Sequence, residues 1–196
     1  MTFAFYYKEL CGLDKPEINQ TARLTAGFCW DWSTRLDSNG EFVKDVQIGD
    51  FAIPWESHEK IVKLPQGYVP WKKWAYRPED LKQCGCIYTA QGFEFDYVGV
   101  IIGPDMKYDP VLGKVVTDKT ANKDPQLTRN SSTQDFDAYC RNIYRVLMSR
   151  GMKGCYVYIC DDALREHFEE QLAHMRRLLR EEYAEANVPN LPSEQA

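Results

Sequence analysis

Blocks of apolar and polar residues alternate along the chain, and three of the apolar blocks predict strands of one sheet. The run ARLTAGFCW favours a strand and ends at the polar, glycine-containing DWSTRLDSNG, so a first strand is predicted near residues 23–30. The runs CGCIYT and YVGVIIG predict two more strands on either side of a Gln-Gly turn. The second run is continuous in valine and isoleucine, which is typical of a strand buried on both faces of a parallel sheet.

Apolar residues recur with a helical period after Thr133, which is the candidate N-cap of a helix that runs to about residue 150. The apolar positions are Phe136, Cys140, Ile143, Val146 and Leu147. Gly151 and Gly154 are expected to end this helix. The run CYVYIC, residues 155–160, then predicts another strand.

A last helix is predicted to open at Asp161 and Asp162. Its glutamates cluster early and its arginines late, which complements the helix dipole. One face of this helix carries Leu164, Phe168, Leu172, Met175 and Leu179. An apolar stripe of this kind predicts an amphipathic helix that covers a core.

Two segments are expected to be irregular. Residues 41–80 contain four prolines and three tryptophans, which favour an insertion packed by its tryptophans. Residues 104–132 are polar with mixed charge and are expected to form a long loop. Because strands alternate with helices and long connections, the sequence predicts an α/β protein with an open, mainly parallel sheet flanked by helices.

Length and composition fit one domain. The chain has 196 residues, of which 44% are hydrophobic, and can bury one sizeable core. We expect an N-terminal segment over residues 1–19, the domain over residues 20–185 and a polar tail over residues 186–196. The apolar patch at the start is too short for a signal peptide or a membrane span, so a soluble, cytoplasmic protein without a membrane partner is expected.

Charge and cysteine content narrow the candidate chemistry. The net charge of −5 gives no footprint of a self-sufficient nucleic-acid binder. Seven cysteines form an odd set, mostly within apolar runs, and are expected to be buried thiols. A zinc site is the alternative, with Cys84, Cys86, Cys155 and Cys160 as ligands. No metal site is predicted, because the first pair lacks the two-residue spacer usual in zinc sites.

Polar residues interrupt the segment IYTAQGFEFDYVGVIIG, residues 87–103, where a core strand would have leucine or valine. Gln91 and Glu94 flank Gly92 in this turn. A turn at the carboxyl edge of a parallel strand lies where α/β sheets bind ligands, and glycine allows a ligand to approach the backbone closely. The local pattern leaves open that Gln91 and Glu94 only cap an exposed turn.

Two segments resemble motifs of known motor proteins. They are TAQGFEFDYVGVIIG and NIYRVLMSRGMKGCYVYIC, and they resemble the fifth and sixth motifs of superfamily 1 helicases. Three blocks in order are similar to the C-terminal half of the bacterial DNA/RNA helicase domain related to group 3 Schlafen proteins: ARLTAGFCWDWS, WAYRPEDLKQCGCIYTAQGFEFDYVGVIIGPD and IYRVLMSRGMKGCYVYICDD. The likeness covers residues 20 to about 162 and implies the second RecA-like lobe of a two-lobed motor.

The resemblance implies a role for each matching residue. Glu94 would accept a hydrogen bond from the nucleotide ribose, and Arg150 would approach the γ-phosphate as a catalytic arginine. Gln91 and Gly92 would shape the turn beside the nucleotide. Tyr88 stands where related motifs often have histidine, so at this position the chain departs from the motif and offers no imidazole.

Arg150 also has a simpler interpretation. A cation at the end of a helix is stabilised by the dipole, typically by about 0.3–1 kcal/mol, without any ligand. A lysine could serve that purpose as well as an arginine.

The segment VPWKKWAYR, residues 69–77, is a candidate platform for single-stranded DNA or RNA. Aromatic faces beside cations suit base stacking and phosphate contacts. The candidate residues are Trp71, Lys72, Lys73, Trp74 and Arg77. The alternative is that the tryptophans are structural and anchor the insertion.

The sequence contains no G-x-x-x-x-G-K-[ST] motif and no apolar strand that ends in an Asp-Glu pair, so the phosphate cradle and the Mg²⁺ ligands are missing. ATP and Mg²⁺ are therefore expected only with a P-loop-containing N-terminal lobe as partner, and the chain alone should not hydrolyse ATP. The expected function is the C-terminal motor lobe of an ATP-dependent DNA/RNA helicase or translocase, from a truncated gene, an excised fragment or a split motor. The alternative is a non-catalytic interaction module that retains the lobe fold.

Overall fold

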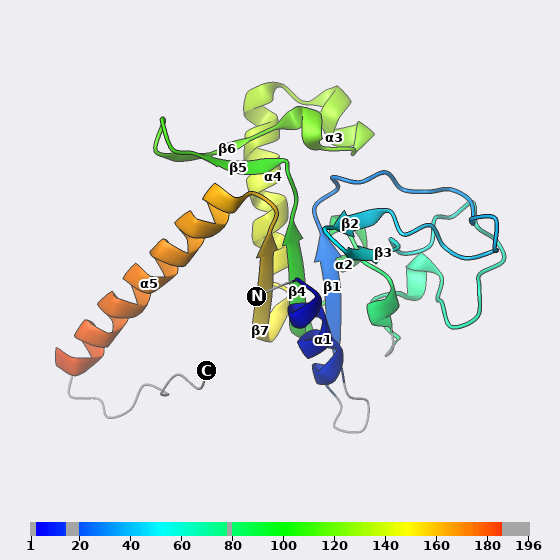
Figure 1. Ribbon diagram of the computed structural model, residues 1–196, viewed down its shortest axis with the longest axis horizontal. Helices are drawn as coiled ribbons and strands as arrows, with labels where there is room; N and C mark the ends of the chain where they lie inside the picture. The colour runs from blue at the N-terminus through cyan, green and yellow to red at the C-terminus, as the bar shows by residue number, and fades with distance from the viewer. Residues whose placement is uncertain (1–2, 15–19, 78–79, 186–196) are drawn as a thin grey trace.

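The computed structural model describes residues 3–14, 20–77 and 80–185 (Figure 1). Its central sheet has the strand order β1-β4-β7, formed by Ala22–Ala26, Phe95–Ile102 and Gly151–Ile159. β4 pairs in parallel with both neighbours. The predicted α/β protein with a mainly parallel sheet is confirmed, although β1 ends at Ala26 and not near residue 30.

Helices cover both faces of this sheet (Figure 1). α1, Phe3–Leu13, contacts β1 and β4 on one face, and α4, Thr133–Met148, contacts β4 and β7 on the other. β4 is buried on both faces, as its continuous valine and isoleucine run predicts. Gly99 lies on the α1 side, where a Cβ atom would come within 2.9 Å of Leu10 and Leu24.

The region of the predicted insertion contains short elements only. β2, Val46–Ile48, pairs antiparallel with β3, Phe51–Ile53, and two 3-10 turns follow at Trp71–Lys73 and Asp80–Lys82. Trp55 and Trp74 are buried. Trp55 packs in the cluster that joins β1 to the hairpin, and Trp74 packs in the core beneath β4 and α4, so the two rings attach this region to the sheet.

The run CGCIYT is not a strand, and that prediction is wrong. Cys84 and Gly85 form only single bridges, to Trp55 and Thr25. The next residues form a helical turn, α2, Ile87–Ala90. Its first turn is closed by a reciprocal cap in which the Cys86 backbone amide donates to the Thr89 hydroxyl at 3.1 Å.

The segment 104–132 is not a long loop, and that prediction is also wrong. It forms a hairpin of β5, Met106–Asp109, and β6, Lys114–Thr117. A 3-10 turn, Lys119–Ala121, and a helix, α3, Pro125–Asn130, follow. The two strands are short and half exposed. Their polar composition therefore lacks the hydrophobic pattern by which a strand is predicted from sequence.

α4 starts as predicted, but its N-cap is Ser132 and not Thr133. The Ser132 hydroxyl accepts from the Asp135 amide at 3.1 Å, and the Asp135 carboxylate accepts in return from the Ser132 hydroxyl. Gly151 and Gly154 do not end this helix, because both belong to β7. The strand begins earlier than the apolar run because its pairing with β4 starts at Gly151.

α5, Asp162–Glu185, follows β7 directly. Leu164 is buried, whereas Leu172, Met175 and Leu179 are exposed, so only the start of the predicted stripe covers the core. The predicted polar tail, 186–196, lies outside the described residues. No helix in the described ranges has the length and apolar character needed to cross a membrane.

Candidate functional site

The Gln91–Glu94 turn connects α2 to β4. Gly92 has φ +86° with open space around it, so this position needs glycine for its backbone angle and not for a close approach. Gln91 and Glu94 are both exposed. The turn precedes β4, so it lies at the amino end of the strand, and the prediction of the carboxyl edge is wrong. The error follows from CGCIYT, which was expected to be a strand that leads into the turn.

Arg150 lies at the same edge, between α4 and β7. The Arg150 carbonyl accepts from the Phe95 amide at 2.8 Å, which pairs this residue with the start of β4. Its guanidinium Nη1 lies 3.4 Å from the Phe93 carbonyl oxygen, inside the turn. The structure therefore brings Arg150 to the segment that carries Gln91, Gly92 and Glu94.

The guanidinium of Arg150 contacts only neutral acceptors among the described residues. Nε donates to the Val146 carbonyl at 3.1 Å, and Nη2 donates to the Ser149 hydroxyl at 2.9 Å. None of the ion pairs within the described ranges includes Arg150. The side chain is half-buried, so its charge can attract an anion that approaches this edge while the carbonyl contacts hold its direction.

Asp96 connects the three strands of the central sheet beside the turn. Its carboxylate accepts from the Thr21 amide at 2.8 Å and pairs with Lys153 at 2.9 Å. The hydrogen bond from Lys153 and the Thr21 amide hold the pKa of Asp96 below its usual range. These contacts join β1, β4 and β7 at their amino ends, so the edge that carries Glu94 and Arg150 is braced by all three strands.

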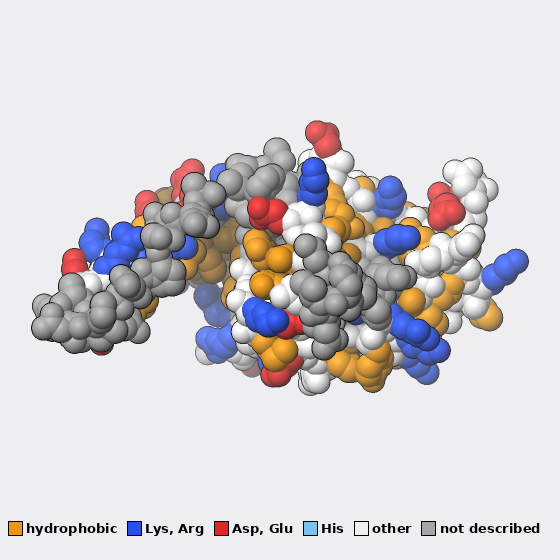
Figure 2. All heavy atoms as spheres, turned by 90° about the horizontal axis from the view of Figure 1, so that it is seen from below, with side chains coloured by type: hydrophobic (Ala, Val, Ile, Leu, Met, Phe, Trp, Pro, Cys, Tyr) orange, Lys and Arg blue, Asp and Glu red, His pale blue; other side chains and the backbone are white. Residues whose placement is uncertain are grey.

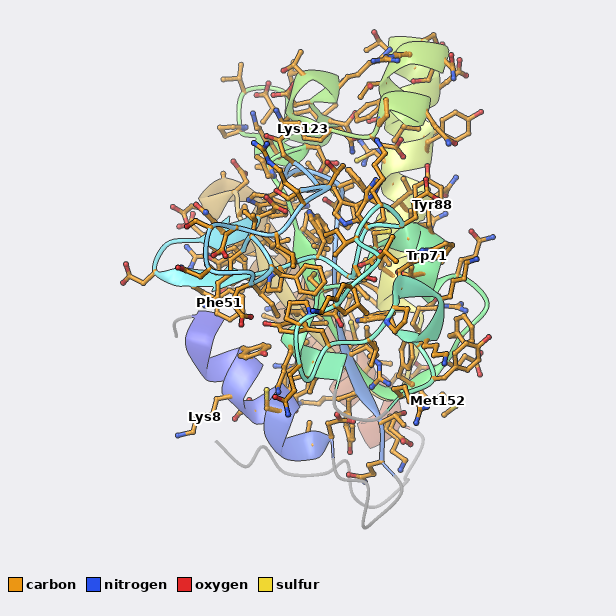
Figure 3. The ribbon with its side chains drawn as sticks, turned by 90° about the vertical axis from the view of Figure 1, so that its right-hand side faces the viewer. Lys8, Phe51, Trp71, Tyr88, Lys123 and Met152 are labelled. Carbon is orange, nitrogen blue, oxygen red and sulfur yellow. The ribbon has the colours of Figure 1, made fainter. Side chains whose placement is uncertain are left out.

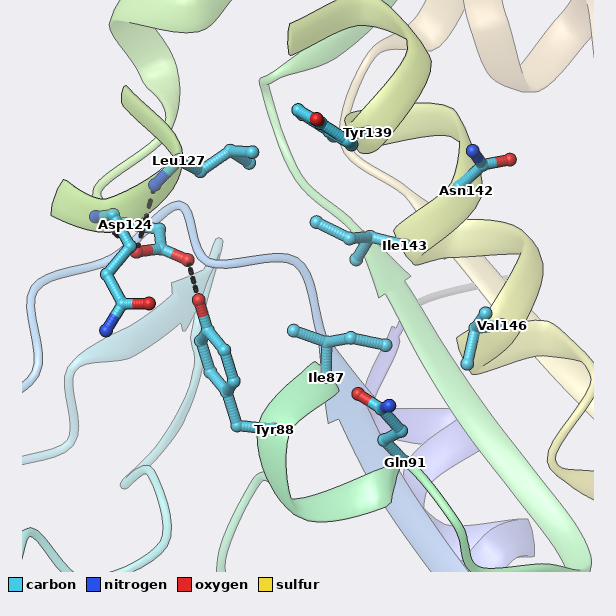
Figure 4. A pocket seen from close by; sticks show the side chains of 10 residues that line it. Ile87, Tyr88, Gln91, Asp124, Leu127, Tyr139, Asn142, Ile143 and Val146 are labelled. Carbon is cyan, nitrogen blue, oxygen red and sulfur yellow. Dashed lines mark hydrogen bonds between the residues drawn. The ribbon is translucent and has the colours of Figure 1, made fainter. Parts of the chain in front are cut away.

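Tyr88 links α2 to α3. Its hydroxyl donates to Asp124 Oδ2 at 2.5 Å (Figure 4). Burial, followed by the Asp124 carboxylate, raises the pKa of Tyr88 above its usual value, so the phenol stays protonated as the donor. Asp124 Oδ1 accepts from the Gln126 amide at 2.8 Å and caps α3. The tyrosine found where related motifs often have histidine therefore positions a neighbouring helix.

A chain of hydrogen bonds continues from Asp124 into the core. The Asp124 amide donates to Asn122 Oδ1 at 2.9 Å, and Asn122 Nδ2 donates to Asp105 Oδ2 at 2.8 Å. Asp105 Oδ1 accepts from the Tyr144 hydroxyl at 2.5 Å. The Tyr144 hydroxyl in turn accepts from the Gly103 amide at 2.8 Å, just beyond the carboxyl end of β4. Buried polar groups are thus satisfied along a path from Tyr88 to the central strand.

Two cavities meet at the Tyr88–Asp124 hydrogen bond. One of about 440 Å³ lies between α2, α3 and α4, and Gln91 is in its wall (Figure 4). The other, of about 330 Å³, has an aromatic wall. The rings in that wall are Phe28, Trp32, His58, Trp71 and Tyr88. Tyr88, Asp124 and Gln126 line both cavities, so the two form one groove divided by this hydrogen bond.

The candidate residues for binding single-stranded DNA or RNA differ in their exposure to solvent. Trp71 lies on the same face as Tyr88 (Figure 3). It is partly exposed, and Lys72 Nζ lies 5.4 Å from its ring centroid. Lys73 and Arg77 are exposed. Trp74 is 0% exposed and cannot offer a ring face to a base.

Trp74 has a structural role. Its indole donates to the Gln83 carbonyl at 3.1 Å, and its ring packs edge-to-face on Phe95 at 5.9 Å between ring centroids. A Cβ atom on Gly85 would come within 2.3 Å of the Trp74 ring. The alternative interpretation of a structural tryptophan therefore fits Trp74, whereas Trp71 keeps the geometry of a platform.

The cysteines proposed as alternative zinc ligands are not alike. Cys84 and Cys86 are buried, Cys160 is half-buried and Cys155 is exposed. Cys86 Sγ donates to Glu56 Oε1 at 3.1 Å. Nowhere in residues 3–14, 20–77 and 80–185 do three or more His, Cys, Asp or Glu side chains gather to hold a metal ion.

Glu56 is a buried acid that sequence reasoning missed. Its side chain is 1% exposed, and Thr89 donates to Oε1 at 3.1 Å. Burial raises the pKa of Glu56 to about 7. A single glutamate inside the tryptophan-rich and proline-rich region gave no signal, because its partners Cys86 and Thr89 come from α2, which was expected to be a strand.

Comparisons with known proteins give the family of the chain. The family profile described as Schlafen group 3, DNA/RNA helicase domain, matches residues 11–161. The chain is 29% identical over 143 residues, 70% of its length, to the uncharacterized protein YPL245W of Saccharomyces cerevisiae, and this region spans 29% of that protein. No solved structure matches the sequence significantly. Since the profile covers most of the chain, including the Gln91–Glu94 turn and Arg150, the chain belongs to the Schlafen group 3 DNA/RNA helicase domain family.

Proposed function

We propose that this chain is the C-terminal, second RecA-like lobe of an ATP-dependent DNA/RNA helicase or translocase. The observation that carries the proposal is the 3.4 Å approach of Arg150 Nη1 to the Phe93 carbonyl oxygen. It unites, at one edge of the parallel sheet, the turn that resembles the fifth helicase motif and the arginine that resembles the sixth. Both lie in the region that matches the helicase-domain family.

Each residue at this edge has a distinct task in the proposal. Arg150 offers a planar, permanently charged fork that can grip two phosphate oxygens. Glu94 is exposed and can accept hydrogen bonds from ribose hydroxyls. Gly92 sets the direction of the turn through its positive φ, so that Gln91 and Glu94 leave the backbone on the exposed side.

The phosphate cradle comes from a partner. The sequence has no glycine-rich P-loop lysine motif, so ATP and Mg²⁺ are bound by a P-loop-containing lobe, in the same polypeptide or in another. Arg150 and Glu94 complete that site from outside. The contacts of Arg150 with Val146 and Ser149 hold its side chain at the edge in advance, which lowers the entropic cost of orienting it for catalysis.

Single-stranded DNA or RNA is the proposed track. Trp71 can stack on a base while Lys72, Lys73 and Arg77 face the phosphates. The aromatic wall of the 330 Å³ cavity extends this surface from Trp71 toward Tyr88 and Gln91. The Gln91–Glu94 turn can thus connect the bound DNA or RNA to the nucleotide. Gln91 lies in the groove, and Glu94 follows Gly92 on the side of the edge that carries Arg150.

An ATPase assay tests the proposal. The purified chain alone should show no turnover, whereas a mixture with a separately prepared P-loop lobe of the same family should hydrolyse ATP, and faster with single-stranded DNA or RNA. Glu94→Ala should lower turnover of the mixture, with Glu41→Ala, at an exposed glutamate outside this edge and outside both cavities, as the control. Turnover by the chain alone that disappears in Glu94→Ala would contradict the dependence on a partner. No turnover in any mixture would favour the interaction module.

A further inference from the structure

The start of α5 is fixed to the body of the domain. Asp161 Oδ1 accepts from the Leu164 amide at 2.8 Å and from the Tyr108 amide of β5 at 3.2 Å. The rings of Tyr108 and His167 stack with their centroids 4.2 Å apart. Leu164 is fully buried, and Phe168 packs partly against the core. The direction of the helix is therefore set by its first two turns.

The rest of α5 extends away from the body (Figure 1). Every described side chain from residue 169 to residue 182 is exposed. A helix of 24 residues is about 36 Å long. Most of the stability of a helix in a protein comes from packing of its apolar face, so a partner on the projecting part would stabilise it.

The projecting part carries an apolar seam that no described segment of the chain covers. Its members are Leu172, 54% exposed, Met175, 52%, Leu178, 43%, and Leu179, 43%. Leu172, Met175 and Leu179 are separated by three and four residues and continue the spacing of Phe168. Steps of three and four that alternate place side chains on the narrow stripe by which two helices pack in a coiled coil.

Opposite charges border this seam. Glu169 and Arg176 follow Phe168 and Met175 by one position each, so they lie on the same side of the seam, one heptad apart. Neither takes part in any of the ion pairs found within the described ranges. In Figure 2 the basic side chains of the projecting helix gather toward its outer part.

We propose that the projecting half of α5 pairs antiparallel with α5 of a second copy of this chain. With Leu172 of each copy packed against Met175 of the other, Glu169 of each helix lies beside Arg176 of its partner helix. Two seam layers and two ion pairs then form around one twofold axis, as an isologous interface requires. In a parallel, in-register pair these positions of the two helices lie on opposite sides of the seam, so Glu169 and Arg176 would not pair.

The antiparallel arrangement also separates the two bodies. Each body is attached at the start of its own α5, so antiparallel helices carry the bodies at opposite ends. A parallel pair would bring both hairpins of β5 and β6 to the same end. The pairing uses none of the residues at the Glu94 and Arg150 edge, so it is independent of the proposed function.

Sedimentation equilibrium of the purified chain over a concentration series tests the pairing. The chain should form a dimer, and Leu172→Asp with Met175→Asp should yield monomer with unchanged near-ultraviolet circular dichroism. Val62→Asp, at a side chain 93% exposed in the insertion, is the matched control and should leave the dimer intact. A monomer at all concentrations, or a dimer that survives both α5 substitutions, overturns the proposal.

A charge exchange tests the antiparallel register. Glu169→Arg or Arg176→Glu alone should weaken the dimer about ten-fold, because each creates two like-charge pairs. The double variant Glu169→Arg/Arg176→Glu restores both pairs and should dimerise like the original chain. Failure of the double variant to recover would overturn the register, and dimers that neither single change weakens would overturn it as well.

Discussion

The guanidinium Nη1 of Arg150 lies 3.4 Å from the carbonyl oxygen of Phe93, and by this contact one side chain joins the end of α4 to the turn before β4. The same arginine donates Nε to the Val146 carbonyl. A helix-end cation would be satisfied by the second contact alone. The first contact aims the guanidinium toward the exposed turn, which favours a role for Arg150 beyond stabilising the helix.

Replacement of Arg150 by lysine separates these two roles. In a motor reconstituted with a P-loop lobe, Arg150→Lys should lower ATP turnover by about 10³-fold or more, because lysine keeps the charge but loses the fork. The midpoint of thermal unfolding should change little. Arg145→Lys, at an exposed arginine of α4, is the control and should leave turnover near that of the original chain. Normal turnover, or unfolding, in Arg150→Lys would leave Arg150 as a helix-end cation only.

Tyr88→Phe removes the donor to Asp124 and keeps the ring. We expect the free energy of unfolding to fall by about 1–2 kcal/mol, since a hydrogen bond to a charged acceptor is lost. Chemical denaturation followed by circular dichroism measures this change. Tyr139→Phe, in the wall of the same 440 Å³ cavity, serves as the control. Equal loss of stability in the two variants would show that the Tyr88–Asp124 bond does not stabilise the fold.

The sequence predicts the central sheet better than its surroundings. The continuous apolar run of β4 has one physical explanation, burial on both faces, and the structure has it so. The hairpin of β5 and β6 lacks such a run, because its strands are half exposed. Its existence depends on pairing across a turn at Gly113, with φ +60°, which composition alone does not reveal.

The candidate site shows the same limit. Local pattern singled out Gln91, Gly92 and Glu94, since polar residues in an apolar segment are conspicuous. The partner of Tyr88 lies 36 positions away along the chain, and no local pattern joins the two. The position of Arg23 is even harder to predict from local pattern, because an arginine is normally expected at the surface. Arg23 lies in β1, is 0% exposed and donates Nε to the Trp74 carbonyl at 3.0 Å.

Glu56 should make stability depend on pH. Burial raises its pKa from 4.5 to about 7, so between these values the folded protein holds a proton that the unfolded chain has released. The contribution of Glu56 is therefore greatest below about pH 4.5 and is lost as pH rises toward 7, by a total of about 3 kcal/mol.

Glu56→Gln isolates this contribution. The free energy of unfolding of the original chain minus that of Glu56→Gln should fall between pH 5 and pH 7, as measured by urea denaturation at each pH. Glu59→Gln, at the exposed glutamate three positions later, should give a flat difference. A flat difference for Glu56→Gln would mean that the buried carboxylate is already ionised at pH 5.

Trp71 and Trp74 are three positions apart but should respond oppositely to substitution. Trp74→Ala removes a fully buried ring and should lower the free energy of unfolding by about 3–5 kcal/mol.

Trp71→Ala should leave stability nearly unchanged and weaken binding of a single-stranded oligonucleotide, measured by fluorescence anisotropy at low salt, by about ten-fold. Lys72→Ala should reduce the slope of the logarithm of affinity against the logarithm of salt concentration by about 0.7. Unchanged oligonucleotide affinity in Trp71→Ala would remove Trp71 from the strand track and leave it as a wall of the cavity.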